Sequence, residues 1–529
     1  MKKNNSRRHF LKSTAQISVS ALISSKVSAQ SKSFELEEIT TKELQTGMQT
    51  GKYSARSVTE AYLKQIAEID RRINSIIELN PEALSIADQL DQERKDGKIR
   101  GALHGIPILI KDNIDTADKM QTTAGSLALA GTIAPRDAFI VEKLRQAGAV
   151  ILGKTNLSEW ANFRSSKSTS GWSGRGGLTR NPYALDRNTS GSSAGSGAAT
   201  AANLCAISIG TETDGSIVSP ASCNSLVGIK PTLGLWSRSG IIPISHSQDT
   251  AGPMTRTVAD AAILLGALCG IDPRDKATAM SQGKLVNDYT VFLDKNGLKG
   301  ARIGVARNYF GFRDRVDKLI NEAVEVIKRL GATVIDMELP NKGKYDEAEL
   351  EVLLYEFKSD LNEYLATRGT NSPVKNIQEV IAFNEKNREK ELQYFNQDTM
   401  IKAAKKGDLK TPAYRQALAK SKRMTRADGI DAALLKNKLD ALVAPTDGIP
   451  WLTDFFNGDH FSGGCSTPAA VAGYPHITVP AGYNNGLPLG VSFFGNAWSE
   501  GKLIKYAYAY EQATKHRQSP KFPASIEGK

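Results

Sequence analysis

Short apolar runs alternate with amphipathic stretches along most of the chain. Residues 106–110 and 149–152 are continuous apolar runs, which are typical of strands buried on both faces of a sheet. Between them, residues 139–144 carry an apolar stripe with helical spacing, and Gly148 is expected to end that helix. This order of helix and strand predicts an α/β fold, with a sheet between layers of helices.

Other segments extend this pattern. Residues 34–95 have helical periodicity, and residues 198–209 and 301–339 each contain a predicted helix and strand. Residues 345–440 are charged and helical, so we expect a helical layer or cap on one side of the sheet. The last predicted strands, each closed by a proline, lie at 441–445 and 477–480.

The segment from residue 157 to residue 197 is rich in Ser, Gly, Thr, Arg and Asn and has almost no apolar run. Such a composition also fits a disordered linker. The segment nevertheless lies between two α/β blocks and contains the aromatic residues Trp160, Phe163, Trp172 and Tyr183. Long ordered loops inside compact domains are usually functional, so we expect it to form a wall of the active site.

The N-terminal 29 residues have the order of parts of an export signal. Residues 6–12 match the twin-arginine motif, a mildly apolar stretch follows at 17–23, and residues 27–29 resemble a cleavage site. We therefore expect residues 1–29 to engage the export machinery and direct the chain to the periplasm or outside the cell. A basic disordered tail is the alternative. No run approaches about 18 apolar residues, so no stable membrane anchor is expected.

The formal net charge of +12 raises the question of a nucleic-acid partner. Residues 1–29 contain six basic residues and no acidic residue, so half of this charge belongs to the predicted signal. The rest of the chain has no basic run interleaved with aromatic residues, and we expect no nucleic-acid partner.

Histidine and cysteine are scarce and lack the spacing of metal ligands. The six histidines include no HExxH pair, and the four cysteines include no CxxC pair. We therefore expect no metal site, and the few histidines also disfavour a Ser-His-Asp hydrolase. An oxidising compartment would permit a disulfide, but buried free thiols are equally consistent with the sequence.

Three separated segments carry candidate chemistry. Lys111 ends an apolar strand, where desolvation lowers the pKa of the amine and makes its neutral form available as a base. Ser192 lies in a glycine- and serine-rich stretch, and Ser216 lies in a tight polar turn whose successive N–H groups can bind an oxyanion. Residues 191–195 also match G-x-S-x-G with Ser193 as the nucleophile. The polar residues before this motif do not form the strand that it needs.

These three segments resemble the amidase signature family, and the spacing of 24 positions from Ser192 to Ser216 fits its pattern. The resemblance covers most of residues 35–515 and is strongest to the bacterial peptide amidases. It implies the amidase-signature fold, a large mixed twisted β-sheet covered by helices on both faces. It also implies a single amidase domain over residues 30–529. The other segments that carry the resemblance are 157–165, 228–232, 241–245, 248–256 and 466–469.

The domain would consist of a signature core at about residues 100–260 and the helical layer at about 345–440. Within the core, the resemblance implies that Ser216 is the nucleophile and Lys111 the general base. Ser192, which would follow a cis peptide bond, would pass the proton between them. No cofactor is implied.

The resemblance also assigns the surroundings of this triad. The backbone N–H groups of Thr213, Asp214, Gly215 and Ser216 would form the oxyanion hole. Ser193 would support the triad, and Ser166 would contact substrate through its backbone. Many family members have glycine where this chain has Asp214, so we expect this side chain to shape the pocket.

The implied reaction is amide hydrolysis through an acyl-enzyme, with water as the second substrate. C-terminal amides of peptides or small amides are the expected substrates. One alternative is the amidotransferase A subunit, which supplies ammonia to tRNA-linked amidation, and an export signal argues against it. The other is a non-catalytic binding protein on the same scaffold.

Overall fold

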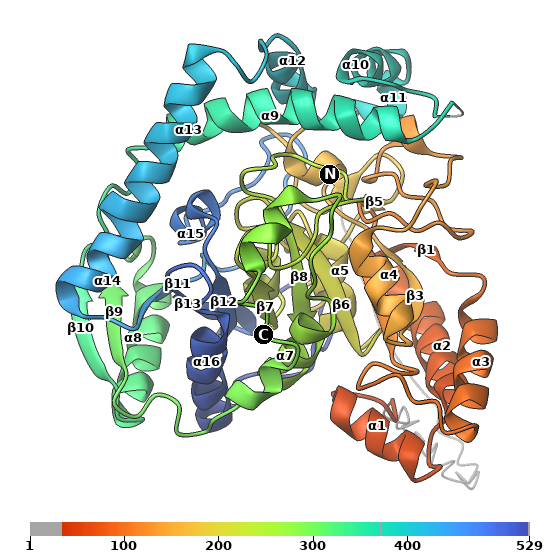
Figure 1. Cartoon of the computed structure of the whole chain (residues 1–529), viewed down its shortest axis with the longest axis horizontal. Helices are drawn as coiled ribbons and strands as arrows, with labels where there is room; N and C mark the ends of the chain where they lie inside the picture. Colours follow the sequence, from red (N-terminus) through yellow and green to blue (C-terminus); the bar gives the residue numbers. More distant parts are fainter. Residues whose placement is uncertain (1–33, 371, 527–529) are drawn as a thin grey trace, which may run out of the picture. The chain divides into compact units, whose positions relative to one another are not determined.

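A mixed sheet of eleven strands forms the centre of the computed structural model (Figure 1). The strand order is β1-β3-β2-β6-β8-β7-β12-β13-β11-β9-β10. The structure describes residues 34–370 and 372–526, so the predicted export signal at 1–29 lies outside the described residues. The strands are β1 (Ile76–Leu79), β2 (Pro107–Lys111), β3 (Val150–Thr155), β4 (Trp172–Ser173), β5 (Gly177–Leu178), β6 (Ile207–Glu212), β7 (Val227–Lys230), β8 (Thr250–Thr255), β9 (Arg302–Ala306), β10 (Thr333–Met337), β11 (Ala441–Pro445), β12 (His476–Asn484) and β13 (Leu487–Phe494).

The sheet mixes parallel and antiparallel neighbours. Strand β2 runs parallel to both β3 and β6, and β9 runs parallel to both β10 and β11. The strands between these two groups pair antiparallel, through β8, β7, β12 and β13. Every residue of β2, β3 and β6 is buried, because helices pack against these central strands. The predicted α/β class and large mixed sheet are therefore confirmed.

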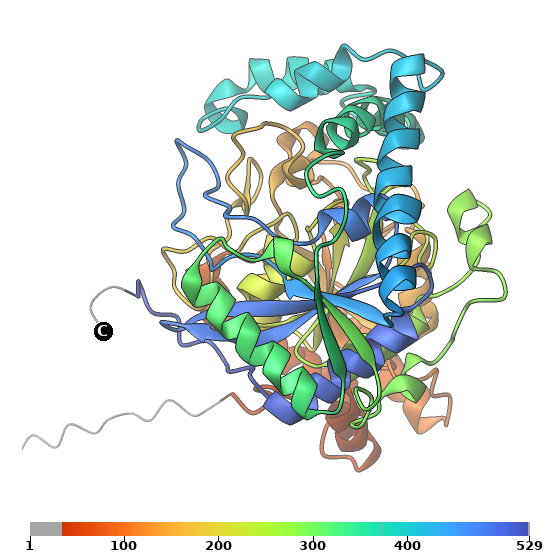
Figure 2. The ribbon, with the colours of Figure 1, turned by 90° about the vertical axis from the view of Figure 1, so that its left-hand side faces the viewer.

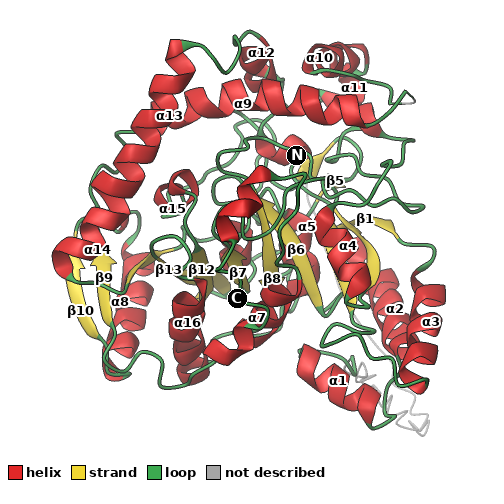
Figure 3. Cartoon of the chain, in the orientation of Figure 1, coloured by secondary structure: helices red, strands yellow, loops and turns green. Residues whose placement is uncertain are grey.

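Helices surround this sheet (Figure 3). Helix α5 packs against β2, β3, β6 and β8, whereas α16 and α8 pack against β12 and β13. None of the helices that the structure describes is long and apolar enough to cross a membrane. The helices are α1 (Thr41–Gln49), α2 (Ala55–Ile73), α3 (Ala83–Lys95), α4 (Phe139–Gln146), α5 (Ala194–Ala201), α6 (Val218–Cys223), α7 (Val258–Ala267), α8 (Asp314–Arg329), α9 (Asp346–Thr367), α10 (Ile377–Lys386), α11 (Arg388–Glu391), α12 (Asp398–Ala404), α13 (Pro412–Thr425), α14 (Asp431–Asn437), α15 (Thr467–Ala472) and α16 (Glu500–Thr514).

The apolar runs at 106–110 and 149–152 form β2 and β3, and the stripe at 139–144 lies in α4. The expectation that residues 34–95 are helical throughout was wrong at one place. Asn74 adopts a left-handed conformation that ends α2, and residues 76–79 then pair antiparallel with β3 as strand β1. The apolar pair Ile76-Ile77 was too short to signal a strand within a helical stretch.

The expected helical layer at 345–440 consists of helices α9 to α14. Figures 1 and 2 both show α9 to α13 along one side of the sheet, next to the loops that follow its central strands. Phe357 and Leu361 of α9 share an apolar cluster with Leu129 and Trp160 from these loops. The layer therefore packs directly on the polar segment at 157–197.

Candidate active site

Lys111 is fully buried at the end of β2, with its amine among hydroxyl groups. Its Nζ lies 2.7 Å from Ser192 Oγ, 3.0 Å from Ser193 Oγ and 2.8 Å from Thr211 Oγ1. Burial lowers the pKa of Lys111 to about 7, against the opposing charges of Asp249 and Glu212. A lysine that faces bulk solvent is thereby excluded, and a neutral amine is accessible near neutral pH.

Strand register explains the position of this amine. Strands β2 and β6 are parallel neighbours in which Ile110 pairs with Ile209, so Lys111 and Thr211 both lie at the carboxyl end of the pair. The Thr211 carbonyl also accepts a hydrogen bond from Lys111 Nζ at 3.1 Å. Asn113 donates to Thr211 Oγ1 at 3.0 Å, which fixes the orientation of this hydroxyl.

Ser192 and Ser193 lie directly before helix α5. The Gly191–Ser192 peptide bond is cis, as the resemblance implied. Gly191 packs so closely on Ser158 that a Cβ would lie 2.2 Å from its Oγ, so a larger residue here would displace the Ser158 side chain. The Ser158 N–H donates to the Ser192 carbonyl at 3.0 Å. The predicted wall segment thus holds this stretch in place.

Ser193 is buried and supports the lysine. Its Oγ donates to the Thr211 carbonyl at 3.0 Å and accepts from the Thr211 N–H at 3.1 Å. Thr189-Ser190 precede Gly191 without strand geometry, so the G-x-S-x-G match is not a strand-to-helix nucleophile elbow. The Ser193 N–H also donates to the Ser216 carbonyl at 3.2 Å, which joins the two serine segments.

Residues 213–216 form the turn between β6 and α6. Glu212 Oε2 accepts hydrogen bonds from the N–H groups of Ile217 and Val218, which fixes the far end of this turn. Gly215 has a φ of +81°, a conformation that favours glycine. No acceptor within the described chain takes the N–H groups of residues 214–216, so these groups are available to a ligand. Ser216 is 9% exposed at this turn.

Thr213, the first residue of the turn, makes two further contacts. Its Oγ1 donates to Asp249 Oδ1 at 2.6 Å, and its carbonyl accepts from Gln248 Nε2 at 3.3 Å. Burial raises the pKa of Asp249 to about 6. Sequence reasoning did not single out Asp249, although it lies within a segment that carries the family resemblance.

The side chain of Asp214 lies near another acidic group. It is half-buried, and its Oδ1 has no hydrogen-bond partner among the described residues. Burial raises the pKa of Asp214, and burial together with the charge of Asp214 raises the pKa of Glu349 in α9.

Ser166 makes its hydrogen bonds to other residues than Lys111 and the hydroxyl groups around it. It is exposed, and its N–H and Oγ bond to the Asp398 carboxylate of α12 at 3.1 and 2.8 Å. Its backbone N–H is therefore already used, and a contact between its carbonyl and substrate stays a prediction.

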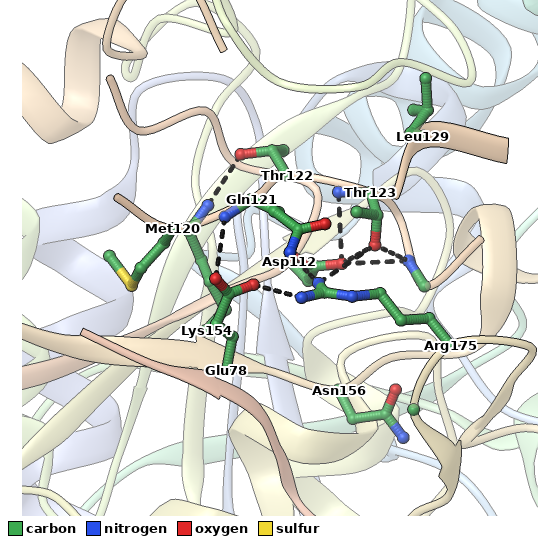
Figure 4. Close-up of polar contacts among 12 residues, drawn as sticks. Glu78, Asp112, Met120, Gln121, Thr122, Thr123, Leu129, Lys154, Asn156 and Arg175 are labelled. Atoms are coloured by element: carbon green, nitrogen blue, oxygen red, sulfur yellow. Dashed lines mark hydrogen bonds and ion pairs between the residues drawn. The ribbon is translucent and has the colours of Figure 1, made fainter. Parts of the chain in front are cut away.

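A buried ionic network fixes the chain immediately after Lys111 (Figure 4). The Asp112 carboxylate accepts hydrogen bonds from Thr123 and from the Gly125 N–H, and it lies 3.5 Å from Arg175. Lys154 of β3 donates to Thr122 Oγ1 at 2.8 Å. Burial lowers the pKa of Lys154. A lysine within an apolar strand is the same signal that identified Lys111, so this residue could have been found from the sequence.

Asp447 connects helix α6, which follows Ser216, to the stretch that carries Ser192. Its buried carboxylate accepts hydrogen bonds from Ser219 Oγ at 2.5 Å and Ser222 Oγ at 2.6 Å. Ser219 Oγ in turn lies 2.6 Å from Ser190 Oγ. Burial raises the pKa of Asp447 to about 7. No local pattern marks this residue, because it lies 228 positions from Ser219.

A cavity of about 450 Å³ has Asn113, Thr211, Thr213 and Asp249 in its wall. At its rim, His246 Nδ1 lies 2.9 Å from Asp360 and its Nε2 lies 3.3 Å from Glu356. Among the described residues, these three side chains are the one group of His, Cys, Asp or Glu whose ligand atoms lie close enough together to hold a metal ion. His246 hydrogen-bonds to Asp360 and lies beside Glu356; burial opposes a charged His246, but the bond to Asp360 and the charge of Glu356 raise its pKa.

The cysteines are not paired. All four, at positions 205, 223, 269 and 465, are buried free thiols. Burial raises the pKa of Cys205 to about 11 and the pKa of Cys465 to about 12, so neither is an activated nucleophile.

Comparison with known proteins agrees with this geometry. Residues 57–504 match the model of the family described as Amidase. The native peptide amidase of Stenotrophomonas maltophilia is 51% identical, covers 92% of this chain and 99% of its own, and superposes with a TM-score of 0.88. A peptide amidase in complex with the competitive inhibitor chymostatin gives 51% identity, 92% and 100% coverage, and a TM-score of 0.89.

More distant relatives include a probable amidase of Arabidopsis thaliana, 42% identical over 93% of both chains. The A subunit of the glutamyl-tRNA(Gln) amidotransferase of Thermotoga maritima is 26% identical, with a TM-score of 0.66 over 89% of this chain and 94% of its own. The chain therefore belongs to the amidase signature family and is an amidase.

Proposed function

We propose that this protein is a serine amidohydrolase in which Lys111, Ser192 and Ser216 carry the reaction. The observation that carries the proposal is the 2.7 Å approach of a fully buried amine to Ser192 Oγ. A buried lysine with a pKa of about 7 can exchange protons with hydroxyl groups at neutral pH.

In the proposed reaction, neutral Lys111 accepts the proton of Ser192 Oγ while Ser192 accepts the proton of Ser216. Ser216 Oγ then attacks the amide carbonyl carbon. The resulting oxyanion faces the N–H groups of the 213–216 turn, a type of interaction whose loss typically costs about 10²–10³ in rate.

Collapse of the tetrahedral intermediate breaks the C–N bond, and the relayed proton returns to the leaving nitrogen. A primary amide thereby releases ammonia and leaves an ester on Ser216. Water then attacks this ester and gives its proton to the same relay. Ser216 departs as a hydroxyl, the product is a carboxylic acid, and no cofactor is consumed.

C-terminal amides of peptides are the substrates that the comparisons favour. The peptide amidase of S. maltophilia is 51% identical over nearly its whole length, whereas amidotransferase A subunits are between 26% and 34% identical. A peptide amidase of the same similarity binds chymostatin as a competitive inhibitor. These likenesses support a site that admits a peptide, and small amides are the second substrate class to test.

The decisive experiment compares wild type with Ser216→Ala on a panel of peptide amides, short aliphatic amides and aryl amides, scored by ammonia or amine release. The matched control is Ser85→Ala, which removes an exposed serine on α3. We expect peptide amides to be the best substrates, Ser85→Ala to match wild type and Ser216→Ala to be inactive. Full activity of a folded Ser216→Ala variant would refute the proposal.

We also propose that residues 1–29 direct export by the twin-arginine route. The support is the order of the charged, twin-arginine, apolar and small-residue parts in the sequence. Replacing both Arg7 and Arg8 with lysine should leave the precursor in the cytosol, while wild type appears as a shorter periplasmic or secreted form. Cytosolic retention of the wild-type chain would refute export.

A further inference from the structure

Asp249 lies where β8 begins, next to the turn that carries Ser216. Glu212 at the end of β6 pairs with Thr250 at the start of β8. The residues just beyond this pair, Thr213 and Asp249, therefore lie side by side at the edge of the sheet. The 2.6 Å hydrogen bond from Thr213 Oγ1 to Asp249 Oδ1 is the consequence.

The carboxylate of Asp249 is held in one orientation. Its Oδ2 accepts hydrogen bonds from the N–H groups of Ile244 and Ser245, each at 2.8 Å. The neighbouring Gln248 binds both the Thr213 carbonyl, at 3.3 Å, and Glu349 of α9, at 2.9 Å. Both ends of Thr213 are thus anchored on residues 244–249, and the turn with its free N–H groups cannot shift independently of this segment.

Asp249 also lines the cavity of about 450 Å³, as does Thr211, whose hydroxyl accepts a hydrogen bond from Lys111 Nζ. Among the charges acting on Lys111, that of Asp249 opposes the desolvation most strongly, followed by that of Glu212. Burial raises the pKa of Asp249 to about 6, against the hydrogen bonds of Thr213, Ser245 and Ile244 and the charge of Arg238. The carboxylate is therefore mainly ionised at pH 7 and above.

Apart from Glu212, which is buried and accepts hydrogen bonds from the N–H groups of Ile217 and Val218, the remaining ionic groups of this cavity are paired or exposed. The pairs are Arg238 with Asp275, Arg274 with Asp272, Asp115 with Arg368, and His246 with Asp360. Arg136 and Glu363 are exposed at the rim. Asp249 and Glu212 differ from these groups because their oxygens bind only neutral donors, so neither negative charge is compensated by a direct ion pair.

We propose that Asp249 is a positioning residue with two effects: it fixes the oxyanion turn through Thr213, and its charge, together with that of Glu212, favours the protonated form of Lys111. This inference rests on the proposed function of Lys111 as the base. No step of bond making passes through Asp249 itself. The two effects can be separated, because Thr213 carries only the first of them.

The experiment measures kcat and KM from pH 5 to pH 9 with a peptide amide that wild type hydrolyses. Asp249→Asn removes the charge and can keep the hydrogen bonds, because its amide oxygen accepts from the N–H groups of Ile244 and Ser245 while its NH2 group donates to Thr213 Oγ1. Lys111 thereby loses a stabiliser of its ammonium form. We expect the acidic limb of the kcat/KM profile to move to lower pH. Thr213→Val removes the hydrogen bond and keeps the charge. We expect kcat to fall by about 10- to 100-fold with KM little changed, and no shift of the limb to lower pH.

Two control variants accompany these. Thr213→Ser keeps the hydroxyl and should recover most of the kcat lost in Thr213→Val. Glu363→Gln removes a carboxylate from the rim of the same cavity and should follow the wild-type profile.

If the acidic limb of the kcat/KM profile of Asp249→Asn coincides with that of wild type, or lies at higher pH, the proposed effect of the Asp249 charge is overturned. Wild-type kcat in Thr213→Val would overturn the positioning effect. Ser216→Ala, measured alongside, keeps the two proposals distinguishable. If Ser216→Ala is inactive and the acidic limb of Asp249→Asn does not move, only the role of Asp249 is refuted. If Ser216→Ala is active, the triad itself is refuted. Should Asp249→Asn fail to fold, Asp249→Glu tests the charge, since it should keep the wild-type limb while altering kcat.

Discussion

The pKa of Lys111 leads to a quantitative prediction for activity against pH. Burial lowers this pKa from 10.5 to about 7. At pH 7.5, an amine with a pKa of 10.5 would be neutral in about 0.1% of molecules, whereas a pKa of about 7 leaves about three-quarters neutral. Burial thereby increases the fraction of molecules with a usable base by nearly a thousandfold.

The expected profile is a rise of kcat/KM with pH, about tenfold per unit well below pH 7, and a plateau above about pH 8. The assay is ammonia release from a peptide amide at a concentration below KM, from pH 5 to pH 9. Circular dichroism at each pH confirms that the protein stays folded. Lys111→Met, which has no proton to exchange, should retain at most about 10⁻³ of the wild-type rate. A kcat/KM that still rises about tenfold per unit up to pH 9, or substantial activity of Lys111→Met, would refute the reasoning.

Three further predictions concern the residues around the triad. Gly195→Ala places a Cβ 2.3 Å from the Ser75 carbonyl oxygen and 2.4 Å from that of Asn156; we expect a loss of about 1–3 kcal/mol in the free energy of unfolding and reduced kcat, and a denaturation midpoint equal to wild type would contradict this. Ser193→Ala leaves the buried Thr211 N–H without its acceptor; kcat should fall by about 10- to 100-fold while labelling of Ser216 persists, and unchanged kcat would mean that Ser193 is dispensable. Burial raises the pKa of Asp447 to about 7 in the folded state, whereas its unfolded pKa is near 3.8. The free energy of unfolding of wild type, relative to that of Asp447→Asn, should therefore fall as the pH rises from 4 to 8. A difference in urea midpoints that stays constant over this range would refute a raised pKa.

The sequence was most informative where chemistry and local pattern coincide. Lys111 could be identified because burying a cation at the end of an apolar run is unfavourable, so a lysine at that position indicates a functional role. Ser192 and Ser216 could be placed because glycine-rich turns of fixed spacing carry the family resemblance. The central strands could also be predicted, because continuous apolar runs such as 106–110 are typical of strands buried on both faces of a sheet.

Residues whose role depends on strand register or on distant contacts could not be predicted. Thr211 binds Lys111 only because β2 and β6 are parallel neighbours with a particular register. Ser166 is hydrogen-bonded to Asp398, a partner 232 positions away that no local pattern indicates. Strand β1 was missed because its pairing with β3, rather than its four residues, defines it as a strand.

The identity of the nucleophile is the most direct test of the account. A fluorophosphonate probe reacts with an activated serine, and mass spectrometry of the digested protein locates the adduct. The account predicts a single adduct on Ser216 in wild type, with labelling that is lost in Lys111→Met and increases with pH around pH 7. An adduct on Ser193, or labelling of Ser216 that is independent of Lys111, would contradict it.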